Sequence, residues 1–243
     1  MLPAMATLDP TRFRALSFDC YGTLIDWERG LLTALHEVFE ARAIHADPDE
    51  LLEAYAVIEP RVEHQAFRPY RQVLELVLDE LCEEFGFPVS PEECAAFAAS
   101  VPAWPAFPDS AAALARLAER YSLFVLSNVD EDLFEGSAER LGRPFTAAYT
   151  AGAIGSYKPD PRNFEHLLER LDADHGIAGH ELLHVAQSRF HDIAPARALG
   201  LATVWVDRRG DAGTAGGGAT APSDATADLT VPNMAALAAL LLD

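Results

Sequence analysis

The sequence is short of basic residues. Its 243 residues include 18 lysines and arginines against 38 aspartates and glutamates, which gives a formal net charge of −20 at pH 7. A surface this acidic repels nucleic-acid phosphates and anionic lipid headgroups. We therefore expect neither nucleic acid nor a membrane as a partner, and a small anionic substrate would need a local positive charge.

Cysteines are few, and long apolar runs and clustered histidines are absent from the sequence. Cys20, Cys82 and Cys94 form an odd set without a CxxC pair, which argues against a disulfide framework and favours a reducing compartment. No run reaches the roughly 18 apolar residues of a membrane-spanning helix, and the start MLPAMATLDPTRFR lacks the pattern of a secretion signal. The histidines lack the spacing of zinc ligands, so no metal site is predicted. These absences predict a cytoplasmic protein.

Short strand-like runs recur along the chain and alternate with helical patterns. The runs are ALSFDC, LFVLSN, AAYTA, LLHVAQS and LATVWVD. The alternation favours an α/β fold with a doubly wound, largely parallel sheet. The stretch 208–228 is rich in Gly, Ala and Thr, which predicts a mobile surface loop before a last short strand and helix.

One interval of the chain is almost wholly helical in pattern. Between about Glu28 and Val101, four segments repeat apolar residues at three-to-four spacing, as amphipathic helices do. Ser90 and Glu93 have the spacing of a capping box at the start of the fourth segment. We predict a helical cap of residues 28–101, inserted into an α/β core made of residues 1–27 and 102–243.

Polar residues follow several predicted strands directly. Asp19 follows the first strand, Ser127 and Asn128 follow the second, and Gln187 and Ser188 follow a later one. The carboxyl ends of parallel strands share one rim, where ligands bind, so these side chains should converge. A single aspartate before a glycine is otherwise explained as a turn residue.

Four motifs occur in a fixed order, FDCYGTLID, LSNVD, SYKPDP and HVAQSRFHDI. Together they resemble the haloacid dehalogenase superfamily over nearly the whole chain. The resemblance implies that Asp19 is a nucleophile, which forms a covalent ester or acyl phosphate that water then cleaves. Thr23 and the backbone around Cys20 and Tyr21 would hold the reacting group.

The later motifs would supply the partners of the nucleophile. Ser127 and Asn128 would donate hydrogen bonds to a substrate oxygen. The ammonium of Lys158 would favour ionised Asp19 and balance charge on the substrate. Asp192 would hold Lys158, position water or bind a metal, although the sequence alone equally allows it to cap the next helix.

Two departures disfavour phosphoryl transfer. Phosphatases of the superfamily usually carry a second acid two residues after the nucleophile and an acidic pair in the fourth motif, but Tyr21 and Gln187 stand there. Fewer carboxylates weaken a Mg²⁺ site. The motif Asp-x-Tyr-Gly-Thr is similar to that of the 2-haloacid dehalogenases, which use no metal and produce 2-hydroxy acids. We therefore predict a small anionic carboxylate substrate and no cofactor. His191, with an ordinary pKa near neutrality, and Ser188 would position the hydrolytic water.

The dehalogenases place an arginine on the second cap helix to receive the halide, and this chain differs. Tyr55 aligns with that arginine, and a phenol donates a hydrogen bond without carrying a positive charge. Other candidates near the pocket are Arg61, Arg68 and Arg71 of the cap, and Trp27 and Trp104 at its hinges.

Three alternative functions stay open. The first is a Mg²⁺-dependent phosphatase with a degraded metal site. The second is a hydrolase of another carbon-bound leaving group, such as a strained ring amine. The third is a non-catalytic binding protein, which the intact Asp19 and Lys158 disfavour. The sequence also leaves open whether the protein forms a homodimer.

Overall fold

A computed structural model describes residues 8–210 and 223–243. Its described part contains a six-stranded sheet in the order β3-β2-β1-β4-β5-β6, and every neighbouring pair of strands is parallel. The strands are β1 (Ala15–Phe18), β2 (Ser122–Ser127), β3 (Ala147–Thr150), β4 (Leu182–Ala186), β5 (Ala202–Val206) and β6 (Leu229–Val231). The predicted parallel sheet is confirmed, whereas residues 211–222 of the predicted loop lie outside the described residues.

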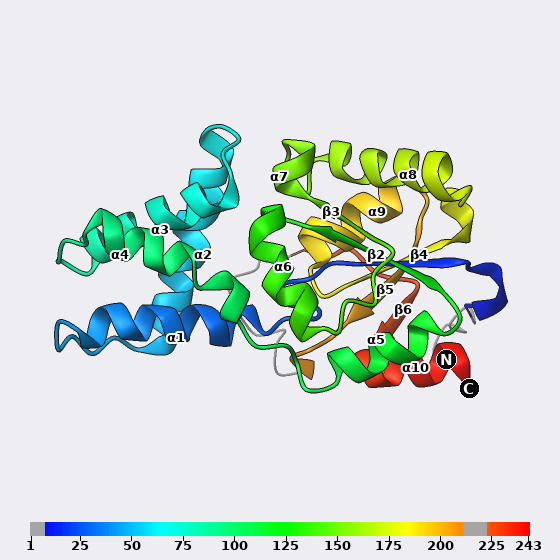
Figure 1. The fold of residues 1–243 in the computed structure, drawn as a ribbon, viewed down its shortest axis with the longest axis horizontal. Coiled ribbons are helices and arrows are strands. Elements are labelled where there is room, and N and C mark those ends of the chain that lie inside the picture. The colour runs from blue at the N-terminus through cyan, green and yellow to red at the C-terminus, as the bar shows by residue number, and fades with distance from the viewer. Residues whose placement is uncertain (1–7, 211–222) are drawn as a thin grey trace.

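Helices cover both faces of the sheet (Figure 1). Along β2, Leu123 and Val125 join one hydrophobic cluster, and Phe124 and Leu126 join another on the opposite face. This alternation follows from the two-residue period of a strand, and a parallel sheet is buried on both faces. Buried residues of α5 (Ser110–Ala118) and α10 (Met234–Leu242) belong to the first cluster. Buried residues of α8 (Pro161–His175) and α9 (Ala194–Ala198) belong to the second.

Four helices between β1 and α5 lie together beyond one end of the strands (Figure 1). They are α1 (Trp27–Glu40), α2 (Pro48–Gln65), α3 (Tyr70–Glu84) and α4 (Pro91–Ala98). Their bounds match the four segments with helical spacing, and the Ser90–Glu93 capping box is present at the start of α4. Other described elements are α6 (Glu131–Arg140), α7 (Ala151–Ile154) and the short turns η1 (Pro10–Arg12), η2 (Val101–Ala103), η3 (Gly179–Glu181) and η4 (Arg189–Ile193).

The start of α3 is fastened to the loop after β2. The Asp130 carboxylate accepts hydrogen bonds from the backbone N–H groups of Tyr70 and Arg71, at 2.8 and 2.9 Å. Arg71 also forms an ion pair with Asp132 at 2.6 Å. A carboxylate at a helix start satisfies backbone donors and complements the helix dipole. These contacts fix α3 relative to the strand ends.

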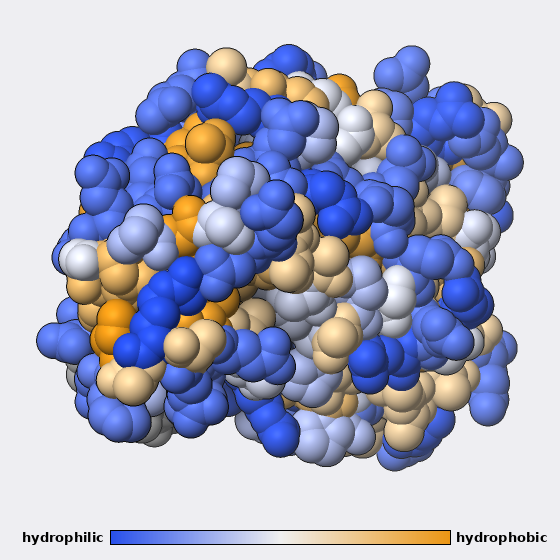
Figure 2. Space-filling model, turned by 60° about the vertical axis from the view of Figure 1, so that its left-hand side comes forward, coloured by the Kyte–Doolittle hydropathy of each residue, from blue (hydrophilic) through white to orange (hydrophobic). Residues whose placement is uncertain are grey.

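The surface carries few large apolar side chains among the described residues. The exposed ones are Val57, Phe67, Leu76, Leu199 and Leu240. On the face shown in Figure 2, hydrophobic residues are scattered among hydrophilic ones. Among the described residues, no helix is both long enough and apolar enough to cross a membrane.

The close approach of α1 to Trp104 generates a stability prediction. A Cβ atom at Gly30 would lie 2.3–2.6 Å from three atoms of the Trp104 side chain, which is 3% exposed. Alanine favours a helix over glycine by about 1 kcal/mol, but overpacking costs about 1–3 kcal/mol. We expect Gly30→Ala to lower the free energy of unfolding by about 1 kcal/mol, measured by urea denaturation.

The control for this prediction is Thr33→Ala on the exposed side of α1, which should change stability by no more than about 0.5 kcal/mol. A Gly30→Ala variant as stable as the unmodified protein would show that α1 does not depend on this contact.

Candidate active site

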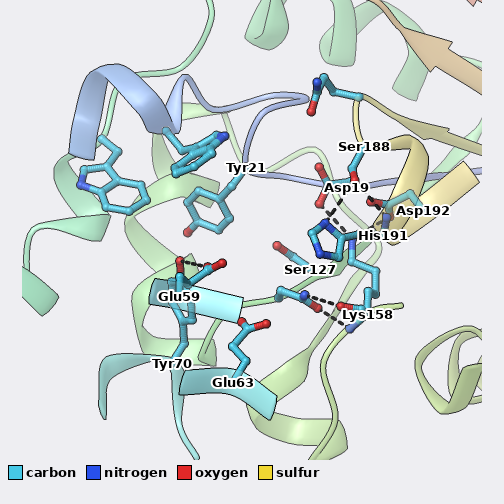
Figure 3. A pocket seen from close by; sticks show the side chains of 14 residues that line it. Asp19, Tyr21, Glu59, Glu63, Tyr70, Ser127, Lys158, Ser188, His191 and Asp192 are labelled. Carbon is cyan, nitrogen blue, oxygen red and sulfur yellow. Dashed lines mark hydrogen bonds and ion pairs between the residues drawn. The ribbon is translucent and has the colours of Figure 1, made fainter. Parts of the chain in front are cut away.

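A pocket lies at the carboxyl ends of β1, β2 and β4, facing α2 and α3 (Figure 3). The sequence-predicted residues that line it are Asp19, Tyr21, Trp27, Trp104, Ser127, Asn128, Lys158, Gln187, Ser188, His191 and Asp192. Its other lining residues are Glu59, Glu63 and Tyr70. The polar residues after three different strands therefore converge, as the rule for parallel sheets predicts.

Asp19 is placed by the turn that ends β1. Its backbone N–H continues the pairing with β4 by donating to the Val185 carbonyl at 3.1 Å. Gly22 has a φ of +94°, which favours glycine. Thr23 donates from Oγ1 to Asp19 Oδ2 at 2.7 Å and accepts from the Gln187 N–H at 2.9 Å. One carboxylate oxygen is thus held by a hydroxyl that is itself held by the loop after β4.

Lys158 holds the other oxygen of Asp19. Its Nζ donates to Asp19 Oδ1 at 2.9 Å, to Asp192 Oδ1 at 2.7 Å and to the Leu126 carbonyl at 2.9 Å. An ammonium has three hydrogens, so these bonds use them all. The Lys158 side chain is 2% exposed, so its charge depends on the two carboxylates.

Asn128 positions this lysine. Its Nδ2 donates to the Lys158 carbonyl at 3.0 Å, and its Oδ1 accepts from the Lys158 N–H at 2.7 Å. The second hydrogen of Nδ2 is not used by this contact and Asn128 lines the pocket, so donation to a substrate oxygen stays a prediction. Its side chain joins the end of β2 to the segment that carries Lys158.

The three charged groups shift one another's pKa values. Burial raises the pKa of Asp19, which the charge of Lys158 opposes. Burial disfavours the ammonium of Lys158, but Asp19 and Asp192 outweigh it and raise the pKa of Lys158. Burial also opposes ionised Asp192, yet Lys158 and His184 lower its pKa. Lys158 therefore stays charged, with Asp192 as its ionised partner.

His184 is a site residue that the sequence reasoning missed. It lies within β4 with no exposed surface, and its Nε2 is 3.1 Å from Asp192 Oδ1. Its Nδ1 is 2.8 Å from Ser17 Oγ. Because an ionised carboxylate only accepts, His184 Nε2 donates to Asp192. The sequence signal that could have identified it is a polar residue within each of two apolar strands, Ser17 in β1 and His184 in β4, which lie opposite each other in the sheet.

Two buried polar atoms lack partners within the described residues. They are Ser127 Oγ and Asp192 Oδ2, on side chains that are 2% and 1% exposed. Buried polar groups are nearly always hydrogen-bonded, so these atoms are available to a ligand or to water. Ser127 offers a donor and Asp192 an acceptor, and both residues line the pocket.

His191 and Tyr21 are both neutral at neutral pH. Burial lowers the pKa of His191 to about 4, so the expectation of a value near neutrality is wrong. Its N–H donates to Ser188 Oγ at 3.0 Å, which holds the loop that carries Asp192. Burial raises the pKa of Tyr21 well above its ordinary value, and its hydroxyl lies 3.0 Å from Ser137 Oγ. Tyr21 is therefore no acid or base at neutral pH.

The structure places Tyr55 behind the pocket wall, although we expected it to receive the leaving group. It is 1% exposed, and its hydroxyl lies 3.0 Å from the Tyr70 hydroxyl. The cap arginines also point elsewhere: Arg61 pairs with Glu80, Arg71 with Asp132, and Arg68 donates to the Val62 carbonyl. Cys20 is fully buried and can offer only its backbone to the pocket.

Glu59 and Glu63 of α2 are pocket residues that the sequence reasoning also missed. Burial raises the pKa of Glu59 to about 7, although the hydrogen bonds from Tyr70 and Tyr55 act to lower that pKa. Burial and the charge of Glu59 raise the pKa of Glu63 well above its ordinary value. The sequence signal was their spacing of four residues, which places them on the same helix face.

The family model of the haloacid dehalogenase-like hydrolases matches residues 13–200. The chain belongs to this family. The (S)-2-haloacid dehalogenase 4A of Burkholderia cepacia is 29% identical over 109 residues, 44% of this chain and 45% of that protein. The (S)-2-haloacid dehalogenase 1 of a Pseudomonas species is 26% identical over 211 residues, 83% of this chain and 86% of that protein.

A phosphatase is also among the relatives. The phosphoserine phosphatase of Thermus thermophilus is 33% identical over 145 residues, 58% of this chain and 55% of that protein. Its match and that of the Burkholderia cepacia dehalogenase thus span about half of each protein's length.

Solved structures of dehalogenases share the fold. A defluorinating L-2-haloacid dehalogenase is 23% identical, with a TM-score of 0.81, covering 95% of this chain and 96% of that chain. Another L-2-haloacid dehalogenase is 26% identical, with a TM-score of 0.76, covering 94% of this chain and 98% of that chain. The protein is therefore a hydrolase whose structural neighbours include L-2-haloacid dehalogenases.

The shared ammonium generates a prediction about stability and pH. Lys158→Met leaves Asp19 and Asp192 buried without their cation, which costs about 3–5 kcal/mol when both are ionised. Because Lys158 lowers the pKa of Asp192, that carboxylate stabilises the fold above an unfolded pKa of about 4, and the variant loses this contribution. We expect the variant's deficit in urea denaturation to be fully present above about pH 5 and to shrink as pH falls through about 4 and below, where Asp192 is protonated.

The control is Arg170→Met, which breaks the exposed ion pair between Arg170 and Asp174 on α8. Exposed ion pairs contribute about 0–1 kcal/mol to the free energy of unfolding, so Arg170→Met should lower stability by no more than this. A Lys158→Met deficit that is absent or does not change with pH would contradict this description of the site.

Proposed function

We propose that this protein is a 2-haloacid dehalogenase-like hydrolase that acts through Asp19. The Asp19 carboxylate displaces the leaving group from carbon 2 of a small carboxylic acid, and water then cleaves the ester to give a 2-hydroxy acid. The observation that carries the proposal is the buried set of Asp19, Lys158 and Asp192 on the pocket wall.

In the first step, an Asp19 oxygen bonds to the substrate carbon and the leaving group departs with the bonding electrons. Thr23 and Lys158 fix the two oxygens of Asp19, which holds the carboxylate in one orientation for attack. The negative charge passes from Asp19 to the leaving group. Lys158 keeps Asp192 as its counter-ion while the ester is neutral, so it need not lose its proton.

In the second step, water attacks the carbonyl carbon of the Asp19 ester, and the bond from that carbon to the ester oxygen of the product breaks. One proton of the water ends on the product hydroxyl, the other is released, and Asp19 is again a carboxylate. The unpartnered Asp192 Oδ2 and the neutral ring of His191 are acceptors that would orient this water. Lys158, next to Asp19 Oδ1, would stabilise the negative charge that develops on the carbonyl oxygen. The unpartnered Ser127 hydroxyl would donate to the carboxylate of the substrate.

We also propose that residues 28–101 act as a cap domain on a core of residues 1–27 and 102–243. Pocket-lining side chains come from α2 and α3 as well as from the strand ends, which supports a role in shielding the reaction from water. A cytoplasmic location is proposed as well. The three cysteines, Cys20, Cys82 and Cys94, are free and buried, which fits a reducing compartment.

Removal of the carboxylate nucleophile should abolish turnover. Asp19→Asn keeps the shape of the side chain, but an amide does not form the ester, so product from 2-chloropropionate should fall below detection. Chloride release measures this, and urea denaturation checks that the variant is folded. Asp172→Asn on the exposed side of α8 is the control and should keep full activity. Turnover by a folded Asp19→Asn variant, with deamidation excluded by mass spectrometry, would show that Asp19 is not the nucleophile.

A phosphatase is the second candidate, supported by the phosphoserine phosphatase relative. An experiment that removes metal ions distinguishes phosphatase activity from dehalogenase activity. Lys158 lies between Asp19 and Asp192, and a divalent cation there would be repelled by the ammonium. We expect EDTA to leave haloacid turnover unchanged and added Mg²⁺ to give no phosphate release from phosphoserine. An EDTA-induced loss that Mg²⁺ reverses would favour the phosphatase.

A further inference from the structure

The pocket wall opposite Asp19 carries two carboxyl groups (Figure 3). Glu59 and Glu63 lie one turn apart on α2 and are both partly buried. Glu59 Oε1 accepts from the hydroxyls of Tyr55 and Tyr70, each at 3.3 Å. Within residues 8–210 and 223–243, no lysine or arginine forms an ion pair with either glutamate. This wall therefore carries two carboxyl groups that have no cationic partner among the described residues.

Acidic side chains outnumber basic ones across the whole pocket. Its lining includes the acids Asp19, Glu59, Glu63 and Asp192, against the single cation Lys158. The three hydrogens of the Lys158 ammonium are already donated. A ligand whose only charge is a carboxylate would find no cation near α2, whereas a positive group there would favour the ionised forms of Glu59 and Glu63 and bind to them.

Aromatic rings line the same part of the pocket. Trp27, Trp104, Tyr21 and Tyr70 all contribute to its lining. The faces of such rings carry negative electrostatic potential and attract cations. Carboxylates together with aromatic rings form a setting that suits a protonated amine better than a halide or a carboxylate.

A separate observation places a polar end of the ligand at β2. The Ser127 hydroxyl is 2% exposed, lines the pocket and has no hydrogen-bond partner among the described residues. A buried hydroxyl without a partner is uncommon and indicates that a ligand or water satisfies it. The pocket thus offers a donor at Ser127 and acceptors at Glu59 and Glu63.

We infer that the substrate carries a protonated amine, which Glu59 and Glu63 bind while Asp19 attacks the neighbouring carbon. The substrate class is then small 2-substituted carboxylic acids that bear an amino group, rather than simple haloacids. This inference rests on the proposed function for the chemistry at Asp19. It differs from the small anionic substrate that the sequence predicts, because the glutamates of α2 were not recognised there.

Matched ligands test the inference. Lactate and isoserine (3-amino-2-hydroxypropionate) are the hydrolysis products of 2-chloropropionate and 3-amino-2-chloropropionate. The two products differ from each other by one ammonium group, and so do the two substrates. Titration calorimetry of the unmodified protein should show isoserine binding about tenfold or more tightly than lactate. Turnover of the amino substrate should exceed that of 2-chloropropionate in kcat/KM by a similar factor. Equal binding, tighter lactate binding or no detectable isoserine binding would overturn the inference.

Matched variants test the residues. Glu59→Gln and Glu63→Gln keep the side-chain shape and remove the charge, so both should lower the preference for isoserine and leave lactate binding unchanged or tighter. Glu53→Gln, on the exposed side of α2, is the control and should keep the preference. A preference that persists in Glu59→Gln and Glu63→Gln would assign amine binding elsewhere and refute this site.

The outcomes separate this inference from the proposed function. Turnover of 2-chloropropionate at least as good as that of its amino analogue, with silent glutamate variants, would refute the inference and keep the function. Glutamate-dependent isoserine binding without turnover of either chloroacid would keep the inference and refute the dehalogenase function.

Discussion

One buried ammonium, that of Lys158, is shared by two carboxylates, and the rest of the site depends on it. Asp19 comes from the end of β1 and Asp192 from the loop after β4, so the pairing ties the reactive residue to the neighbouring strand. Asn128 fixes the backbone of Lys158 from the end of β2. Buried ions are costly unless they are paired and hydrogen-bonded, and here the carboxylates make the ammonium stable. The same pairing that permits burial holds Asp19 in one orientation.

The two walls of the pocket make different demands on a substrate. The wall formed by the strand ends carries Asp19, its partner Lys158 and the Ser127 hydroxyl, and the proposed displacement at a carbon beside a carboxylate uses these groups. The wall formed by α2 carries Glu59 and Glu63, and the fastening of the start of α3 by Asp130 fixes where the α2–α3 pair lies. Under the proposed function, the strand ends hold Asp19 for the chemical steps, and the helices between β1 and α5 select the substrate.

The features that were predictable from the sequence are those set by local pattern. The period of apolar residues located the strands and the four helices, and the rule that strand ends meet at one rim brought Asp19, Ser127 and Gln187 together. The roles expected for Lys158 and Asp192 came from the family resemblance. The misplaced features depend on tertiary contacts. Burial decided the pKa of His191. The orientation of α2 put Tyr55 behind the wall and Glu59 in it, which spacing alone does not determine because both lie on one helix face.

The covalent role of Asp19 is tested most directly by isotope transfer in a single turnover. With enzyme in excess over a 2-haloacid in H₂¹⁸O, water attacks the carbonyl of the Asp19 ester. The account predicts that ¹⁸O appears in the peptide containing Asp19, and that the hydroxyl of the first product molecule is unlabelled, because it comes from the aspartate. Label in the product hydroxyl, with none in the Asp19 peptide, would mean that water attacks the substrate directly and would contradict the account.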